Sequence, residues 1–178
     1  MRRLYTTDSH LLMIDFQARL MPAIHDGMAA VARARTLLAG ARLLRVPRSF
    51  TEQVPDKLGQ TIPDLAPGPG EAVLPKSRFD AGSEVGLAAR LPSERGIVVA
   101  GCEAHVCVLQ TVLGLLEERR EVAVVIDATG SRRPEDRAAA LARMERAGAM
   151  LVTTEMVLFE WMGGSNHPRF REVSALIR

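Results

Sequence analysis

The stretch of the chain that decides the fold is GIVVAGCEAHVC, residues 96–107. Its first half is an apolar run with a glycine at each end, which predicts a fully buried β-strand. Its second half predicts a turn and then a helix, because apolar residues recur at helical spacing from His105 to Arg120. A buried strand that leads directly into an amphipathic helix is typical of a parallel α/β sheet.

The same alternation of strand and helix signals continues on both sides of this stretch. Short apolar runs predict further strands over residues 10–14, 46–50, 72–75, 121–126 and 149–152. Helical spacing and boundary signals predict further helices over residues 28–44, 82–91, 134–147, 154–161 and 168–177. Residues 53–70 are rich in proline and glycine and predict a long ordered excursion. The sequence therefore predicts one domain over residues 1–178, a three-layer α/β/α sandwich with a six-stranded parallel, Rossmann-like sheet.

The composition is that of an ordinary globular protein, with 47% hydrophobic and 25% charged residues among 178. The net charge is +2 and the arginines are scattered, so no basic stripe indicates a nucleic-acid partner. No apolar stretch reaches the roughly 18 residues that span a bilayer, and the N-terminus lacks the apolar core of a signal peptide. Two cysteines are too few for a disulfide-stapled secreted fold. We therefore expect a cytoplasmic protein with no membrane or nucleic-acid partner.

Three side chains that can take part in catalysis follow predicted strands at the point where each strand ends. Asp15 follows residues 10–14, Lys76 follows residues 72–75, and Cys107 lies just past residues 96–101. The carboxyl ends of parallel strands meet at one edge of the sheet, where α/β proteins bind ligands. Taken singly, the three residues fit a buried cysteine, a turn-forming aspartate and a solvated lysine. Their joint placement instead predicts a site for covalent acyl transfer.

Each of these side chains has a chemical reason to be at such a site. A helix N-terminus and a neighbouring ammonium both favour a thiolate, so we expect the pKa of Cys107 to be lowered. A carboxylate such as Asp15 can take the thiol proton and return it to a leaving amine. The backbone N–H groups of residues 104–107 are placed to stabilise an oxyanion.

The motifs LMIDFQ (12–17), LPKSRF (74–79) and VAGCEAHVCV (99–108) together resemble the isochorismatase-like cysteine hydrolase superfamily. Within it, the chain is most similar to the isochorismatase domain-containing protein branch. The segments that carry this similarity are TEQ (51–53), SRRPED (131–136), TEMVLFEW (154–161) and HPRF (167–170). The resemblance implies Asp15 as general acid and base, Lys76 as electrostatic partner and Cys107 as nucleophile. It also implies a cis peptide bond at Cys102–Glu103 and a homodimer or higher homo-oligomer.

The activity implied by the resemblance is hydrolysis of a C–N bond in a small amide through a thioester on Cys107. Nicotinamidases of the superfamily carry an Asp–His–His metal site where this chain reads TEQV (51–54), and its four histidines show no ligand spacing. We therefore expect no metal, and the absence of a G-x-G-x-x-G motif predicts no dinucleotide cofactor. Isochorismatases proper lack the nucleophilic cysteine, so we do not expect that activity.

Further residues near the three candidates are predicted to contact a small-molecule substrate, although each also has a structural explanation. Phe16 and Gln17 stand at the pocket mouth or fill space beside the sheet, and Phe79 is a pocket wall, an interface residue or core. Glu103 and His105 shape the pocket or cap the helix, and Ala104 and Val106 complete the turn beside the nucleophile. Two alternative functions stay open: a binding protein that retains the hydrolase fold, and a thiol redox sensor at Cys107.

Overall fold

The computed structural model describes residues 3–84, 86, 91 and 95–178. Within them, six strands form one parallel sheet in the order β3-β2-β1-β4-β5-β6. The strands are β1 (Ser9–Ile14), β2 (Arg48–Gln53), β3 (Ala72–Lys76), β4 (Gly96–Cys102), β5 (Val122–Gly130) and β6 (Met150–Val152). This is the six-stranded parallel sheet that the sequence predicted.

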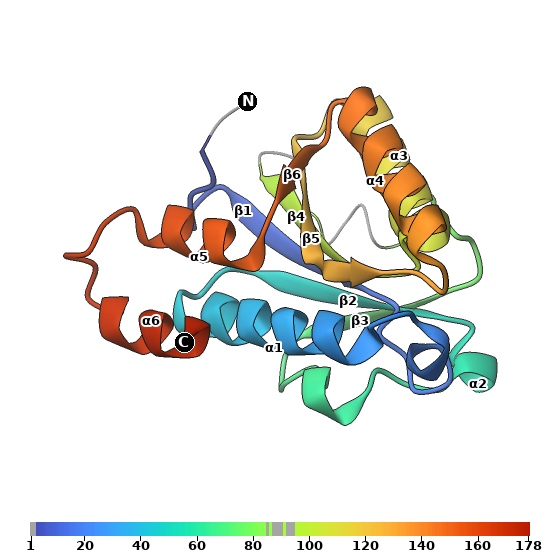
Figure 1. The fold of residues 1–178 in the computed structure, drawn as a ribbon, viewed down its shortest axis with the longest axis horizontal. Helices are drawn as coiled ribbons and strands as arrows, with labels where there is room; N and C mark the ends of the chain where they lie inside the picture. The colour runs from blue at the N-terminus through green and yellow to red at the C-terminus, as the bar shows by residue number, and fades with distance from the viewer. Residues whose placement is uncertain (1–2, 85, 87–90, 92–94) are drawn as a thin grey trace.

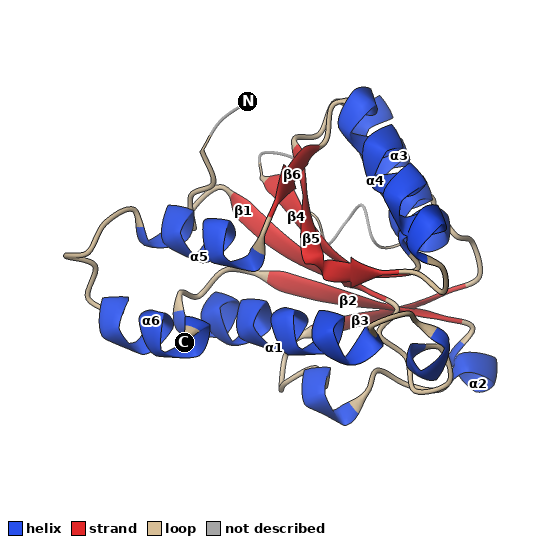
Figure 2. Cartoon of the chain, viewed as in Figure 1, coloured by secondary structure: helices blue, strands red, loops and turns tan. Residues whose placement is uncertain are grey.

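Helices cover both faces of the sheet and complete the three layers (Figures 1 and 2). The first face carries α1 (Gly27–Leu43), α5 (Thr154–Met162) and α6 (Phe170–Ile177), and the second carries α3 (Leu109–Glu117) and α4 (Pro134–Ala147). The remaining helical segments are short: η1 (Met21–Ala23), α2 (Pro55–Leu58), η2 (Pro63–Leu65) and the π-helical turn η4 (Ala104–Val108). The predicted three-layer α/β/α sandwich is therefore confirmed.

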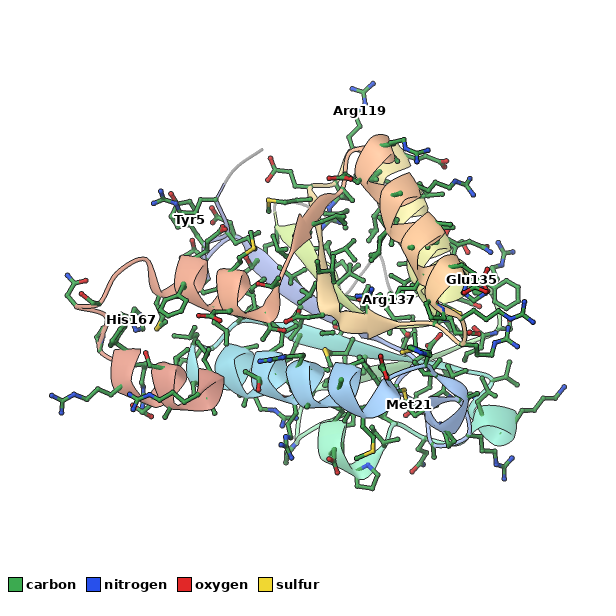
Figure 3. All side chains as sticks on the ribbon, in the orientation of Figure 1. Tyr5, Met21, Arg119, Glu135, Arg137 and His167 are labelled. Carbon is green, nitrogen blue, oxygen red and sulfur yellow. The ribbon has the colours of Figure 1, made fainter. Side chains whose placement is uncertain are left out.

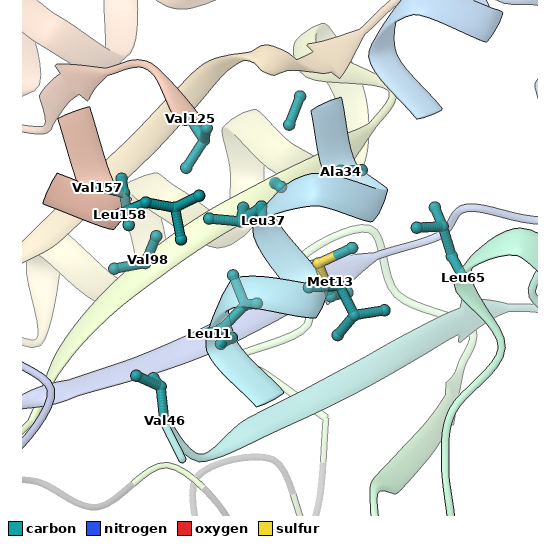
Figure 4. Close-up of a cluster of buried hydrophobic side chains, with 14 of the residues drawn as sticks. Leu11, Met13, Ala34, Leu37, Val46, Leu65, Val98, Val125, Val157 and Leu158 are labelled. Carbon is teal, nitrogen blue, oxygen red and sulfur yellow. The ribbon is translucent and has the colours of Figure 1, made fainter. Parts of the chain in front are cut away.

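Two apolar cores lie against the two faces of the sheet, and β1 contributes to both. Leu11 and Met13 pack with α1 and α5, whereas Leu12 and Ile14 pack with α3 and α4. Figure 4 shows the first core, in which Leu37 of α1 lies close to Leu158 of α5. A strand buried on both faces needs apolar residues at successive positions, which explains why its sequence shows no polar alternation.

The structure extends two strands by several residues beyond their predicted ends, and β3 and β4 by one residue each. Strand β2 continues from residue 50 to Gln53, and β5 continues from residue 126 to Gly130. Both extensions are polar, so hydrophobic patterning did not mark them, but pairing holds them: Gln53 is in register with Lys76, and Gly130 with Cys102. Arg137 of α4 donates to the Thr129 carbonyl at 2.8 Å and to the Ile126 carbonyl, bracing the extended end of β5 (Figure 3).

Two helix predictions need comment. The helix expected from His105 to Arg120 is in two parts, the π-helical turn η4 and then α3, which ends at Glu117. Half of the residues expected to form a helix over 82–91 lie outside the described residues, and the described ones, 82–84, 86 and 91, form turns and bends. Among the helices that the structure does describe, none is long and apolar enough to cross a membrane.

The order of the strands reverses between β1 and β4. The chain passes from β1 outward to β2 and β3, then returns to place β4 on the other side of β1. The two strands approach so closely here that a Cβ on Gly101 would lie 2.4 Å from the Ile14 carbonyl oxygen. The next peptide bond, Cys102–Glu103, is cis, as the resemblance implied. A crevice at such a reversal is where α/β proteins bind ligands.

Candidate active site

The carboxylate of Asp15 lies at this reversal, directly after β1. Its backbone has a φ of 54°, a left-handed conformation that aspartate tolerates better than most residues. Oδ1 accepts a hydrogen bond from Thr51 Oγ1 at 2.6 Å, and Oδ2 lies 2.8 Å from Lys76 Nζ. Both side chains of the ion pair are fully buried. Removing only one partner of an ion pair that is buried in this way strongly destabilises the fold.

The second oxygen of Asp15 is incompletely satisfied. Oδ2 is at ion-pair distance from Lys76 but meets the angles of a hydrogen bond with no described group. Buried acceptors are nearly always hydrogen-bonded, so an exception calls for an explanation. A carboxylate oxygen with spare acceptor capacity can receive a further donor.

The ammonium of Lys76 is held by three acceptors. Nζ contacts Asp15 Oδ2 at 2.8 Å, Gln53 Oε1 at 2.5 Å and the Arg78 carbonyl at 3.3 Å. The contacts with Gln53 and Arg78 are hydrogen bonds, and the contact with Asp15 is an ion pair. Lys76 therefore brings a positive charge against both the Asp15 carboxylate and the Gln53 amide oxygen.

The thiol of Cys107 lies in η4, only 6% exposed, beside Asp15 and Lys76. Its pKa is raised to about 12, first by burial and then by the Asp15 charge, while the Lys76 charge acts in the opposite direction. The lowered pKa expected from the sequence is therefore wrong. The helix N-terminus was a correct local feature, but the thiol is desolvated and has an anion beside it. The Cys107 side chain is therefore a neutral thiol at neutral pH.

Gln53 completes the group of side chains around the thiol. Its Oε1 lies 4.0 Å from Cys107 Sγ, at the limit of a sulfur hydrogen bond. Its Nε2 donates to the Ser77 carbonyl at 2.7 Å. Sequence reasoning assigned no role to Gln53 or Thr51, because it ended β2 at residue 50. The signal that could have found them is the shared carboxyl edge of three neighbouring strands.

The residues predicted beside Asp15 are buried. Phe16 is 1% exposed within the first core. Gln17 is fully buried and bonds only to backbone, donating to Gln53 O at 3.0 Å and Gly59 O at 2.6 Å and accepting from Gln53 N at 2.7 Å. Gln17 therefore fastens the segment that follows β2. Substrate contact by Phe16 and Gln17 stays a prediction.

The residues predicted around the nucleophile have varied surroundings. Glu103 Oε1 accepts from Arg132 Nε at 2.8 Å, and His105 Nδ1 lies 3.0 Å from Ser131 Oγ. Ala104 is fully buried, Val106 is half-buried with its N–H donating to Glu103 O at 3.1 Å, and Phe79 is 49% exposed. The N–H of Val106 is thus already used, which leaves its neighbours as the oxyanion donors to consider. Among the described residues, no three His, Cys, Asp or Glu side chains form a group that could hold a metal.

The parallel sandwich, with a cysteine, an aspartate and a lysine gathered at its strand reversal, defines the class of isochorismatase-like α/β proteins. The family model for the isochorismatase domain matches residues 9–156. The chain belongs to this family.

Curated relatives agree with this assignment. Isochorismatase domain-containing protein 1 of Salmo salar is 38% identical, over 92% of this chain and 59% of its own length. The chain thus spans about three fifths of that relative. Isochorismatase domain-containing protein 2 of Homo sapiens is 36% identical, over 99% of this chain and 86% of its own length.

Solved structures show the same fold. The MAR1 ribonuclease of Caenorhabditis elegans has a TM-score of 0.94 at 37% identity, covering 99% of this chain and 92% of that one. YcaC of Pseudomonas aeruginosa, solved with hexane-2,5-diol and covalent acrylamide, has a TM-score of 0.90 at 26% identity, with coverages of 99% and 90%. The Escherichia coli ycaC product, described as an octameric hydrolase of unknown specificity, has a TM-score of 0.87 at 25% identity, with coverages of 97% and 95%. The structural neighbours therefore include a hydrolase.

Proposed function

We propose that this chain is a cysteine-dependent hydrolase that cleaves the C–N bond of a small amide through a thioester on Cys107. The observation that carries the proposal is the placement of the buried Asp15 carboxylate beside the protonated Cys107 thiol, with the Lys76 ammonium 2.8 Å from its Oδ2. A thiol with a pKa of about 12 attacks a carbonyl only if a base takes its proton. Asp15 is that base.

In the first half of the reaction, Asp15 takes the proton of Cys107 Sγ as sulfur bonds to the carbonyl carbon. The carbonyl π electrons move to oxygen, which becomes an oxyanion. Backbone N–H groups of η4 next to Val106 stabilise this charge. The C–N bond then breaks as Asp15 delivers its proton to nitrogen, so the amine leaves neutral and the acyl group stays on sulfur.

In the second half, water attacks the thioester carbon while Asp15 takes a proton from it. The C–S bond breaks, the acid is released, and the proton on Asp15 returns to sulfur. The positive charge of Lys76 lowers the pKa of the thiol and so favours the thiolate at both its formation and its release. No group in this cycle is oxidised or reduced.

The alternative functions are less well supported. A redox-sensing cysteine relies on thiolate character, and burial holds Cys107 protonated. The covalent acrylamide of the Pseudomonas aeruginosa structure and the hydrolase name of the Escherichia coli one favour covalent hydrolytic chemistry in this fold. The octamer of the latter also supports the proposal that this chain forms a homo-oligomer.

The test is a hydrolysis screen of small amides, esters and an RNA oligonucleotide with the wild type, Cys107→Ser and Cys102→Ser. Cys102 is the matched control, because it is fully buried in the opposite core. We expect amide turnover that disappears in Cys107→Ser and persists in Cys102→Ser, with an acyl adduct on Cys107 in the mass spectrum of the acid-quenched enzyme. Turnover that survives Cys107→Ser, of RNA or of amide, contradicts the proposal.

A further inference from the structure

Gln53 is fixed in one orientation beside the nucleophile. Its Nε2 donates to the Ser77 carbonyl at 2.7 Å, and its Oε1 accepts from Lys76 Nζ at 2.5 Å. A flipped amide would set an N–H against the ammonium and an oxygen against a carbonyl, so only this orientation is satisfied. Gln17 bonds to both backbone polar groups of Gln53, at 3.0 and 2.7 Å. The acceptor oxygen therefore faces the thiol permanently.

One lone pair of this oxygen is available on the side of the thiol. A carbonyl oxygen can accept two hydrogen bonds. Lys76 supplies one, and the second donor among the described residues is the Cys107 thiol, with Sγ 4.0 Å from Oε1. A thiol is a weak donor. Once Asp15 takes the thiol proton, this buried acceptor loses even that donor, and leaving it unpaired is unfavourable.

We propose that Gln53 Oε1 is the acceptor that recognises an N–H on the scissile nitrogen of the substrate. This inference rests on the proposed function and narrows its substrate class to amides that carry at least one proton on that nitrogen. The scissile nitrogen is bonded to the carbon that sulfur attacks, so it lies within two bonds of Sγ. An acceptor 4.0 Å from Sγ is within hydrogen-bond reach of that nitrogen.

The arrangement discriminates between leaving groups. A primary amide offers an N–H to Oε1 and replaces the donor that the thiol has lost. An ester places an oxygen lone pair against Oε1, and an N,N-dimethyl amide places a methyl group there. An analogue that leaves a buried polar group of the site unpaired is a much poorer substrate, with a lower kcat/KM.

The experiment compares kcat/KM for matched primary amides and methyl esters (acetamide and methyl acetate, benzamide and methyl benzoate) in the wild type and Gln53→Met. Methionine keeps the length of the side chain and removes the acceptor. We expect the amide-to-ester ratio to fall at least ~10-fold, the effect of losing one hydrogen bond to a buried group. Sulfur attacks a carbonyl carbon in both substrates, so the ratio reports on the leaving group.

Two further variants separate recognition from structure. Gln53→Glu keeps acceptor oxygens, so we expect a lower absolute rate but a ratio within ~3-fold of the wild type, since the acceptor hydrogen bond is retained. Gln17→Met loosens the backbone of Gln53 without removing its acceptor, so both rates fall and the ratio holds. A ratio that is unchanged in Gln53→Met, or that falls equally in Gln17→Met, overturns the inference.

A second measurement applies if the wild type hydrolyses none of these substrates, a result that contradicts the proposed function. The carbamoylation rate of Cys107 by cyanate, which leaves an N–H on the carbon that sulfur attacks, is then compared with that by N,N-dimethylcarbamoyl chloride, which leaves none there, each normalised to N-acetylcysteine. The inference expects a preference for the N–H reagent that is lost in Gln53→Met. No preference in the wild type overturns it independently of turnover.

Discussion

The two ends of β1 each carry a buried titratable side chain in closely similar surroundings. At the amino end, His10 Nε2 lies 3.0 Å from Ser49 Oγ of β2; at the carboxyl end, Asp15 Oδ1 accepts from Thr51 Oγ1 of the same strand at 2.6 Å. Each group also keeps one buried polar atom without a hydrogen-bond partner in the described part of the chain, His10 Nδ1 and Asp15 Oδ2. The local arrangements match, but the charges around them differ.

The imidazole of His10 lies near two cations, and no anion among the described residues is a cause of its pKa shift. Burial and the nearby cations Arg95 and Arg120 lower its pKa to about 4, so it is neutral at neutral pH. Asp15 instead faces the ammonium of Lys76. The buried polar side chain at the amino end of β1, His10, thus forms part of the fold, whereas the one at the carboxyl end, Asp15, is a candidate base. The difference teaches that an opposite buried charge, not burial itself, separates a candidate catalytic end from a structural one.

The largest expected effect comes from removing the charge at the carboxyl end. In Asp15→Asn we expect kcat/KM for amides to fall at least ~1,000-fold, because the general acid and base is lost. The remaining ammonium of Lys76 is buried and unpaired, so the free energy of unfolding falls by about 3–5 kcal/mol. Turnover and urea denaturation measure these two losses.

The charges of Asp15 and Lys76 should shift the reactivity of the Cys107 thiol in opposite directions. The Asp15 charge raises the pKa of Cys107 and the Lys76 charge lowers it. The pH midpoint of iodoacetamide labelling should therefore move down in Asp15→Asn and up in Lys76→Met. The double variant removes both charges and keeps the comparison available if either single variant is unstable. Shifts of the same sign in both single variants contradict the arrangement.

The next prediction concerns the contribution of His10 to stability at acid pH. Its folded-state pKa of about 4 lies below the unfolded value of 6.5, so between these values the unfolded chain binds more protons. Stability is therefore full above pH 6.5 and is lost as the pH falls toward 4. The loss is about 3 kcal/mol, measured from urea unfolding at several pH values.

The matched control for this loss is His10→Gln, which keeps a polar group near Ser49 but does not titrate. We expect the variant to show little loss between pH 6.5 and 4.5. Below pH 4.5 the free energies of unfolding of the wild type and the variant should fall with similar slopes. In both proteins Glu71 then loses its contribution, because Arg42 and Arg48 lower its pKa to about 2 despite its burial. Equal slopes above pH 4.5 contradict the role of His10.

Sequence patterning located most of the fold but only part of the candidate site. The apolar run at residues 10–14 and the boundary signals of residues 134–147 have direct local causes, and the structure places β1 and α4 there. Asp15, Lys76 and Cys107 were found because each follows a recognisable strand. Thr51 and Gln53 were not, since they belong to a polar strand end that only pairing with β1 and β3 holds in place. The sign of the Cys107 pKa shift depends on burial and on a distant aspartate, which local sequence does not encode.

A further prediction tests the hydroxyl at the carboxyl end of β1, beside the candidate base. Thr51→Val keeps the shape of the side chain and removes the donor to Asp15 Oδ1. A hydrogen bond to a charged group contributes roughly 1.5–3 kcal/mol, so amide turnover should fall on the order of 10-fold as the carboxylate loses its fixed orientation. The labelling ratio of Cys107 to Cys102 provides a readout that does not depend on the substrate. A loss of stability with unchanged turnover and labelling contradicts a positioning role.

The smallest expected effect comes from the equivalent hydroxyl at the amino end. Ser49→Ala leaves His10 Nε2 without its partner, and an unpaired buried neutral group costs about 1–2 kcal/mol of stability. Because no charge at that end takes part in the proposed chemistry, turnover and Cys107 labelling should stay at the wild-type values while the urea midpoint falls. Thr51→Val and Ser49→Ala change hydroxyls two residues apart on one strand. If both variants lowered turnover equally, packing of β2 against β1, and not the charge at its carboxyl end, would account for the site.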